Sequence, residues 1–158
     1  MAEKRIAIFP GSFDPFTRGH ESVVRRAMSL FDEIIISIGA NALKDGYLTL
    51  ENRKKMISTV FRDSGMVRVE HFSGLTVDYC RKMKAGYLLR GVRTAADFEY
   101  ERAIAQMNKS LAPDIESILL LTTPEHTHIN STIVRDVIRN GGDASLFLPE
   151  GIKIEEYL

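Results

Sequence analysis

The stretch with the most chemically suggestive residue types is residues 10–20, which read PGSFDPFTRGH. Thr17 is a suitable helix cap, and it places His20 in the first turn of a helix. At such a turn, unpaired backbone N–H groups and the helix dipole attract anions, and the glycines leave room for a phosphate. Ser12 adds a hydroxyl donor. A lone histidine is more often an ordinary helix residue, so it is the combination that predicts a phosphate-binding turn with His20 directed at the ligand.

Two arginines form a second candidate for phosphate binding. Arg90 directly follows the apolar residues 87–89, and Arg93 comes three residues later. Guanidinium groups at the end of a strand could bind a phosphate bidentately. They could equally form ion pairs with nearby acids, namely Asp97, Glu99 and Glu101. The spacing alone does not decide between these two interpretations.

The other candidate residues form no recognisable catalytic or metal-binding set. His126 and His128 alternate on an extended loop without a third Cys, His or carboxylate nearby, which makes a poor zinc site. Cys80 is typical of a small core residue. We find no Ser-His-Asp set, no paired carboxylates and no Cys-His pair, and we predict no protein-built metal site.

Short apolar runs alternate with helical segments along the chain. We expect strands at residues 5–9, 33–38, 67–72, 87–89 and 117–121. Several of these runs are almost continuously apolar, as is typical of strands buried on both faces. The first helix has the apolar spacing of a buried stripe, carried by Val23, Val24, Ala27, Met28 and Phe31.

Further helices are predicted from caps and breakers. Thr49 could cap residues 50–61, a third helix spans residues 75–84, and Asp97 could cap residues 98–111. The last main helix begins after Asn130 or Ser131 and ends at two glycines. It carries Ile133, Val134, Val137 and Ile138, and a short surface segment follows at residues 150–158.

This order of elements predicts an α/β fold in one domain spanning residues 1–158. We expect a Rossmann-like, doubly wound, five-stranded parallel sheet with helices on both faces. Ligands of such sheets bind beyond the carboxyl ends of the strands. We therefore expect the ligand-binding site to be formed by the loops at residues 10–20, 39–48, 72–76, 90–97 and 122–132.

The composition is that of an ordinary globular protein. The 158 residues contain 21 Lys and Arg against 21 Asp and Glu, so charge favours neither nucleic acid nor an anionic membrane as partner. The single cysteine rules out an intrachain disulfide and suits a reducing compartment. No signal-peptide stretch or membrane-length apolar run is found, so we expect a cytoplasmic protein.

Three motifs carry a resemblance to a known family. GSFDPFTRGH resembles the T/H-x-G-H signature of the nucleotidylyltransferase superfamily, with Thr17 in place of the first histidine. Within that superfamily, the start of this motif and LLRGVRTAADFEYE (residues 88–101) resemble phosphopantetheine adenylyltransferases. INST (residues 129–132) is similar to the superfamily's I-S-S-T turn. The resemblance covers nearly the whole chain, but Arg18 stands where a small polar residue is expected, and Asn130 replaces a serine.

The resemblance implies a function and a set of site residues. The function is transfer of the adenylyl group of ATP to 4′-phosphopantetheine, which gives dephospho-coenzyme A and pyrophosphate. It implies a catalytic role for His20, and acceptor binding by Ser12, Lys44, Thr76 and Arg90. The implied ATP-binding residues are Ser12, Phe13, His20, Gly91, Val92, Arg93, Glu101, His126, Thr127, His128, Ile129, Asn130, Ser131 and Thr132. It also implies a homohexamer with feedback inhibition by coenzyme A.

This chemistry is consistent with the residues present. A phosphate monoester with a second pKa of about 6 is already largely ionised at neutral pH, so in-line attack needs no general base. Mg²⁺ would be held mainly by the ATP phosphates. Two alternatives stay open. One is a related nucleotidylyltransferase acting on nicotinamide mononucleotide or a polyol phosphate, although those families usually have His at the Thr17 position. The other is a non-catalytic nucleotide-binding module.

Overall fold

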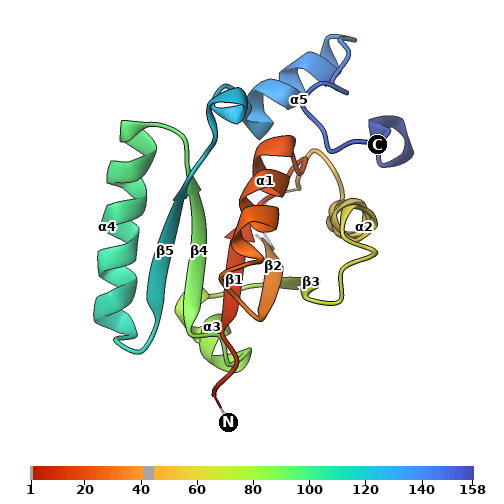
Figure 1. Cartoon of the computed structure of the whole chain (residues 1–158). Coiled ribbons are helices and arrows are strands. Elements are labelled where there is room, and N and C mark those ends of the chain that lie inside the picture. Colours follow the sequence, from red (N-terminus) through yellow and green to blue (C-terminus); the bar gives the residue numbers. More distant parts are fainter. Residues whose placement is uncertain (1, 41–44) are drawn as a thin grey trace.

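The computed structural model describes residues 2–40 and 45–158 of the chain. Its strands form one parallel five-stranded sheet in the order β3-β2-β1-β4-β5 (Figure 1). The strands are β1 (Ile6–Gly11), β2 (Glu33–Gly39), β3 (Val67–Phe72), β4 (Tyr87–Val92) and β5 (Glu116–Leu121). This arrangement confirms the predicted doubly wound, Rossmann-like class.

The sheet has its switch point between β1 and β4. β1 pairs with β2 from Ile6 to Gly11, but with β4 only at Ala7 and Ile8. Strands β2 and β3 extend the sheet on one side of β1, and β4 and β5 extend it on the other. Beyond Ile8 the two central strands therefore separate. In sheets of this kind, ligands bind at such a point.

Two strands extend at least two residues further at their carboxyl ends than the sequence suggested. Residues 10–11 and 90–92 were expected in loops, but they are the last residues of β1 and β4. The register with the outer neighbour continues to their ends, pairing Gly11 with Ile38 and Val92 with Leu121. Backbone pairing with one neighbour outweighs the turn preference of Pro and Gly here.

Helices cover both faces of the sheet. The buried side chains of α1 and α2 join the core cluster that contains Ala7 and Phe9, whereas those of α3 join a second cluster around Ile8 and Ile35. Figure 1 shows α4 beside β4 and β5, and α5 beyond the carboxyl ends of the strands. The helices are α1 (Arg18–Ala27), α2 (Leu50–Val60), α3 (Thr76–Lys82), α4 (Ala95–Leu111) and α5 (Ser131–Arg139).

The helix caps confirm some expectations and correct others. Thr17, Thr49 and Asn130 cap α1, α2 and α5 with their side chains. The prediction that Asp97 caps α4 is wrong, because the helix begins three residues earlier and Thr94 accepts a hydrogen bond from the Asp97 N–H across 3.1 Å. Helix α3 is shorter than predicted, because it begins at Thr76 and ends at Lys82.

The C-terminal segment is anchored more firmly than a surface segment would be. A 3-10 turn spans Ile154–Glu156, and Ile152, Ile154 and Tyr157 are buried in the core cluster of α1 and α2. The Tyr157 carbonyl accepts a hydrogen bond from the Asn52 side chain. Among the described residues, no helix is long and apolar enough to cross a membrane.

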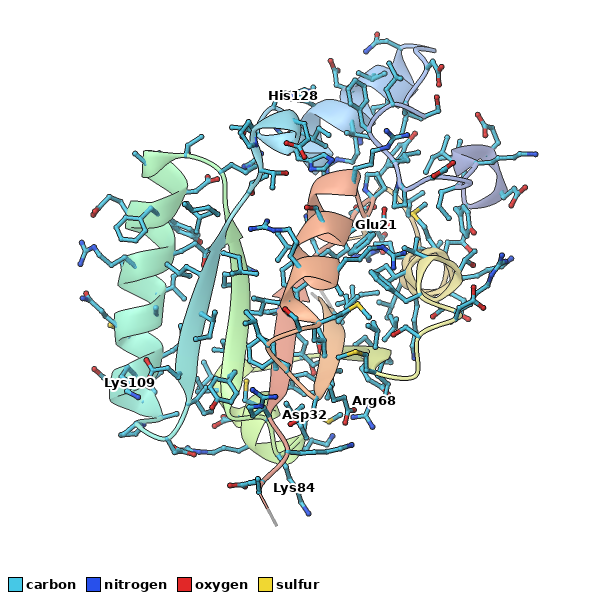
Figure 2. The ribbon with its side chains drawn as sticks, in the orientation of Figure 1. Glu21, Asp32, Arg68, Lys84, Lys109 and His128 are labelled. Atoms are coloured by element: carbon cyan, nitrogen blue, oxygen red, sulfur yellow. The ribbon has the colours of Figure 1, made fainter. Side chains whose placement is uncertain are left out.

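The two ends of the sheet differ in chemistry. Figure 2 shows Asp32, Lys84 and Lys109 at the end where the strands begin, and His128 at the opposite end. Ion pairs such as Lys109–Glu116 are exposed at the first end. The predicted motifs gather at the other end, around the split between β1 and β4.

Candidate active site

A cavity of about 320 Å³ opens where β1 and β4 separate. Three segments far apart in the sequence line it: the first loop, the end of β4 with the start of α4, and the connection before α5. The predicted site residues at its wall are Ser12, Phe13, His20, Arg90, Gly91, Arg93, Glu101, Ile129, Asn130, Ser131 and Thr132. The structure thus brings the three motifs of the sequence together.

The orientation of His20 is fixed by the cap of its own helix. The Thr17 hydroxyl oxygen accepts from the His20 backbone N–H at 3.4 Å, and the Thr17 backbone N–H donates to His20 Nδ1 at 3.0 Å. This reciprocal pair is a capping box, with a histidine in the place usually taken by Glu or Gln. Since Nδ1 accepts a hydrogen bond, the neutral ring carries its proton on Nε2.

Aromatic rings surround the His20 imidazole. The ring centroids of Phe13 and Phe16 lie 5.0 Å and 5.3 Å from it, and that of Phe9 lies 6.3 Å away. Burial among these rings, together with the charges of Arg90 and Arg93, lowers the pKa of His20 from 6.5 to about 3. His20 is therefore neutral near pH 7, and its N–H is a hydrogen-bond donor without a full charge.

The first loop is shaped by Phe13. Its φ of 48° is unusual for a residue with a side chain, and its ring is buried against Phe9 and Phe16. A Cβ at Gly11 would lie 2.8 Å from this ring, so the close approach requires glycine. Because the ring faces the core, only the backbone of Phe13 can serve a nucleotide. The Ser12 side chain is exposed at the cavity wall.

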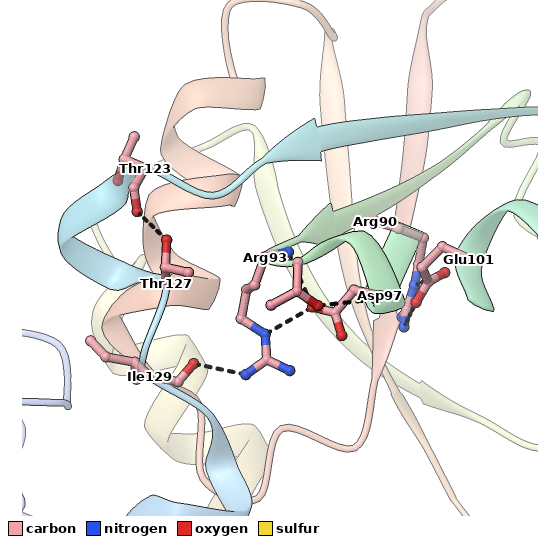
Figure 3. Close-up of polar contacts among 8 residues, drawn as sticks. Arg90, Arg93, Asp97, Glu101, Thr123, Thr127 and Ile129 are labelled. Atoms are coloured by element: carbon pink, nitrogen blue, oxygen red, sulfur yellow. Dashed lines mark hydrogen bonds and ion pairs between the residues drawn. The ribbon is translucent and has the colours of Figure 1, made fainter. Parts of the chain in front are cut away.

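Both arginines are paired with acids from helix α4 (Figure 3). Arg90 forms a bidentate pair with Glu101, at 2.7 Å and 3.0 Å, and Arg93 lies 3.1 Å from Asp97. Arg93 also donates to the Ile129 carbonyl at 3.2 Å. The ion pairs weighed as an alternative are thus present for two of the three acids, while both arginines also line the cavity. Each arginine can therefore reach a ligand in the cavity while a carboxylate of α4 neutralises its charge.

The connection from β5 to α5 contributes its first residue, Thr122, and the residues from Ile129 onward to the cavity, but not the residues between them. Ile129 to Thr132 line it, whereas His126, Thr127, His128 and also Val92 are not among its lining residues. His126 Nδ1 lies 3.1 Å from the Thr123 hydroxyl, and the ring of His128 packs edge-on against Phe147. The Ser131 hydroxyl donates to the Pro15 carbonyl at 2.8 Å, which joins this connection to the first loop.

A second cavity of about 280 Å³ lies against the first. The two share Pro10, Gly11, Arg90 and Glu101. Thr76 lines the second cavity, between the strands and helix α4. Its wall is mostly apolar with a few polar groups, formed by Phe72, Leu88, Tyr100, Ile104, Leu119, Ser117 and Asn108. Lys44, predicted to bind the acceptor, lies outside the described residues.

Two buried residues that support the first loop were missed in the sequence. The Asp14 carboxylate accepts from the backbone N–H groups of Tyr47 and Leu48 at 2.7 Å and 2.8 Å. Arg53 donates to the Ser12 carbonyl at 2.9 Å. Asp14 lies within the first motif, but neither residue could be assigned a role from the sequence, because their partners are backbone groups about 30 to 40 positions away.

Comparison with known proteins agrees with the family resemblance that the three motifs suggested. The chain matches the cytidylyltransferase-like family over residues 8–137. It is 52% identical to a phosphopantetheine adenylyltransferase from Flavobacterium psychrophilum and 50% identical to one from Phocaeicola vulgatus, in each case over 96% of this chain and 99% of the relative.

A solved structure shares the fold. The chain resembles a bifunctional NMN adenylyltransferase/ADP ribose pyrophosphatase from Francisella tularensis, crystallised with AMP and a Mn ion, with a TM-score of 0.72 at 19% identity. The match covers 96% of this chain but 46% of that protein, so the chain spans about half its length. At this identity the likeness concerns the fold alone.

Proposed function

The chain belongs to the phosphopantetheine adenylyltransferases, and we propose that its cavity aligns ATP and 4′-phosphopantetheine for direct adenylyl transfer. The enzyme is a nucleotidyltransferase of coenzyme A biosynthesis, and the products are dephospho-coenzyme A and pyrophosphate. The observation that carries the mechanism is the meeting of His20, Arg90 and Arg93 at one cavity.

The reaction makes one bond and breaks one. A phosphate oxygen of the acceptor attacks the α-phosphorus of ATP, and the bond from that phosphorus to the oxygen of the β-phosphate breaks, which releases pyrophosphate. No proton has to be removed from the acceptor, because its phosphate is largely dianionic above a pH of about 6. The protein's tasks are alignment and stabilisation of charge.

His20 is suited to donate and unsuited to act as a base. Its Nδ1 already accepts from the Thr17 N–H, and its Nε2 carries the proton. With a pKa of about 3, the ring is also a weak proton acceptor. We therefore assign His20 the role of an Nε2–H donor to the charge that develops on the α-phosphate.

The two cavities fit the two substrates. Arg93, Gly91 and the turn at residues 129–132 would hold ATP in the first cavity, near the first turn of α1. Arg90 would hold the acceptor phosphate where the cavities meet. The apolar second cavity, with Thr76 and Asn108 at its wall, suits a pantetheine arm that combines methylene groups with amides.

The residues at the cavity fit Mg²⁺ that arrives with the nucleotide. Within residues 2–40 and 45–158, no group of three or more His, Cys, Asp or Glu could hold a metal ion. The cavity carboxylates of Asp97 and Glu101 are engaged by arginines. Mg²⁺ takes most of its ligands from phosphates and water, and the exposed Ser12 hydroxyl at the cavity wall would be available as a further oxygen ligand. The bound ion would neutralise phosphate charge.

We also propose a cytoplasmic homohexamer that is inhibited by coenzyme A. Helix α4 exposes Tyr100, Ile104, Met107 and Leu111 at helical spacing, and such an apolar stripe supports self-association. Sedimentation of the wild type and of Met107→Glu tests this assembly. A hexamer that dissociates in the variant is expected, and a monomeric wild type would contradict it. Coenzyme A should compete with the acceptor, because it contains the pantetheine arm.

A pyrophosphate-release assay tests the function. We expect release with ATP and 4′-phosphopantetheine, and little with CTP or with nicotinamide mononucleotide as acceptor. Preference for another phosphate acceptor would favour a related nucleotidylyltransferase. Binding of ATP without release for any acceptor would favour a non-catalytic nucleotide-binding module.

A further inference from the structure

Glu101 occupies an unusual place for a carboxylate. It is the one buried residue of helix α4, and its side chain is only 8% exposed. Both of its oxygens face Arg90: Oε1 accepts from Nη2 at 2.7 Å and Oε2 accepts from Nε at 3.0 Å. Figure 3 shows the two side chains together. A desolvated carboxylate in this geometry fixes the plane of the guanidinium group.

Three of the five hydrogen-bond donors of Arg90 have partners within the protein. A guanidinium group has five N–H donors, one on Nε and two on each Nη. Glu101 takes the Nε donor and one Nη2 donor, and the Pro10 carbonyl takes one Nη1 donor. One N–H on Nη1 and one on Nη2 remain. Since Arg90 lines both cavities, these two donors are the ones that a phosphate can use.

We propose that Glu101 is a positioning residue for the acceptor phosphate and acts through Arg90. The sequence motif implied a contact with ATP instead. The inference rests on the proposed function, because it assumes that Arg90 binds the acceptor. Glu101 and the Pro10 carbonyl hold the guanidinium group from two sides, so that its remaining donors meet the phosphate where the cavities join. Without Glu101, the flexible Arg90 side chain would adopt several orientations, and few of them would bind the phosphate with both donors.

Glu101→Gln is the sharpest substitution for a test. It keeps the size of the side chain, but it removes the charge and presents an amide N–H where Arg90 needs an acceptor. Glu99→Gln is the matched control, because Glu99 lies on the same helix, pairs with Arg102 and lines neither cavity. Asp97→Asn is the second comparison, because Asp97 holds Arg93 rather than Arg90.

The readout is binding of three ligands to each variant by calorimetry: 4′-phosphopantetheine, pantetheine without the phosphate, and ATP. For Glu101→Gln we expect the Kd of 4′-phosphopantetheine to rise roughly tenfold to a hundredfold, as for lost charge-assisted hydrogen bonds, while pantetheine and ATP change less than about threefold. A residue with a merely structural role would affect pantetheine as well. Glu99→Gln should leave all three ligands unchanged, and Asp97→Asn should affect ATP alone.

Several outcomes would overturn the inference. Weaker ATP binding with unchanged acceptor binding in Glu101→Gln would show that Glu101 contacts ATP, as the motif implied. Equal losses of affinity for pantetheine and 4′-phosphopantetheine would show a general loss of structure. If Glu101→Gln does not fold, Glu101→Asp takes its place. That variant keeps the charge but withdraws it by one methylene, and we expect a smaller loss confined to the phosphate-bearing ligand. Absence of pyrophosphate release by the wild type would instead refute the proposed function.

Discussion

The Thr17 backbone N–H donates to Nδ1 of His20 across 3.0 Å, and this bond assigns the proton of the neutral ring to Nε2. The same two residues cap helix α1. One local structure therefore begins the helix, orients the imidazole and sets its tautomer. The T-x-G-H spacing achieves this because the cap and the third helical residue are always adjacent in a capping box.

Replacing His20 tests whether its Nε2–H matters for turnover. We expect His20→Ala to lower kcat by roughly a hundredfold to a thousandfold, the size found when one transition-state donor is removed, with little change in ATP affinity. His20→Gln retains an N–H donor at similar reach and should lose less. Turnover close to the wild type in His20→Ala, measured by pyrophosphate release, would remove His20 from the mechanism.

The low pKa of His20 also predicts a pH dependence of stability. The folded-state pKa of about 3 lies below the ordinary value of 6.5, so the unfolded chain binds this proton more readily. His20 thus contributes stability that is fully present above pH 6.5 and is lost as the pH falls toward 3. The free energy of unfolding in urea should therefore fall more steeply between pH 7 and pH 4.5 for the wild type than for His20→Gln. Parallel pH profiles for the two proteins would contradict the lowered pKa.

The two arginines should bind different ligands. Arg93→Ala should weaken ATP and Arg90→Ala should weaken 4′-phosphopantetheine, each by about 1–3 kcal/mol, as for charge-assisted hydrogen bonds. Calorimetry with each ligand separately measures this split. If both variants lose both ligands equally, the ion pairs with Asp97 and Glu101 would be structural, and the arginines would not discriminate between the substrates.

Arg18, a departure from the family motif, should act on stability rather than on the site. Its side chain donates to the carbonyls of Leu148 and Ser145 at 2.6 Å and 3.2 Å, and it is not among the residues that line the first cavity. We expect Arg18→Ala to lower the free energy of unfolding by about 1–3 kcal/mol with unchanged ATP affinity. Weaker ATP binding at unchanged stability would show that Arg18 reaches the nucleotide.

Local patterns were sufficient to predict most of the fold. The strand at Val67–Phe72 was placed at its observed bounds, and the caps Thr17 and Thr49 were identified from residue type alone. These features depend on neighbours within a few positions. The ends of β1 and β4 depend instead on how far distant strands stay paired, so residues 10–11 and 90–92 were misplaced.

The sequence predicted which loops form the candidate site, but not which side chains pair with one another within it. The spacing in the sequence did not decide which of three nearby acids pair with the two arginines. Helix α4 decides among them, because Asp97 and Glu101 lie one turn apart and face the sheet, whereas Glu99 pairs with Arg102. The pKa of His20 depends in part on the charges of two arginines some 70 positions away, which no local pattern reveals.

Attack on ATP by a pre-ionised phosphate, without a general base, is tested most directly by the pH dependence of kcat/KM for the acceptor. We expect kcat/KM to fall below the second pKa of the phosphate, about 6, and the low pKa of His20 keeps the titration of this residue out of that range. A thiophosphate acceptor has a lower second pKa, and the fall in kcat/KM should shift to lower pH by the difference between the two pKa values. A fall that stays at the same pH for both acceptors would belong to a group of the enzyme, and it would contradict attack by a pre-ionised phosphate without a general base.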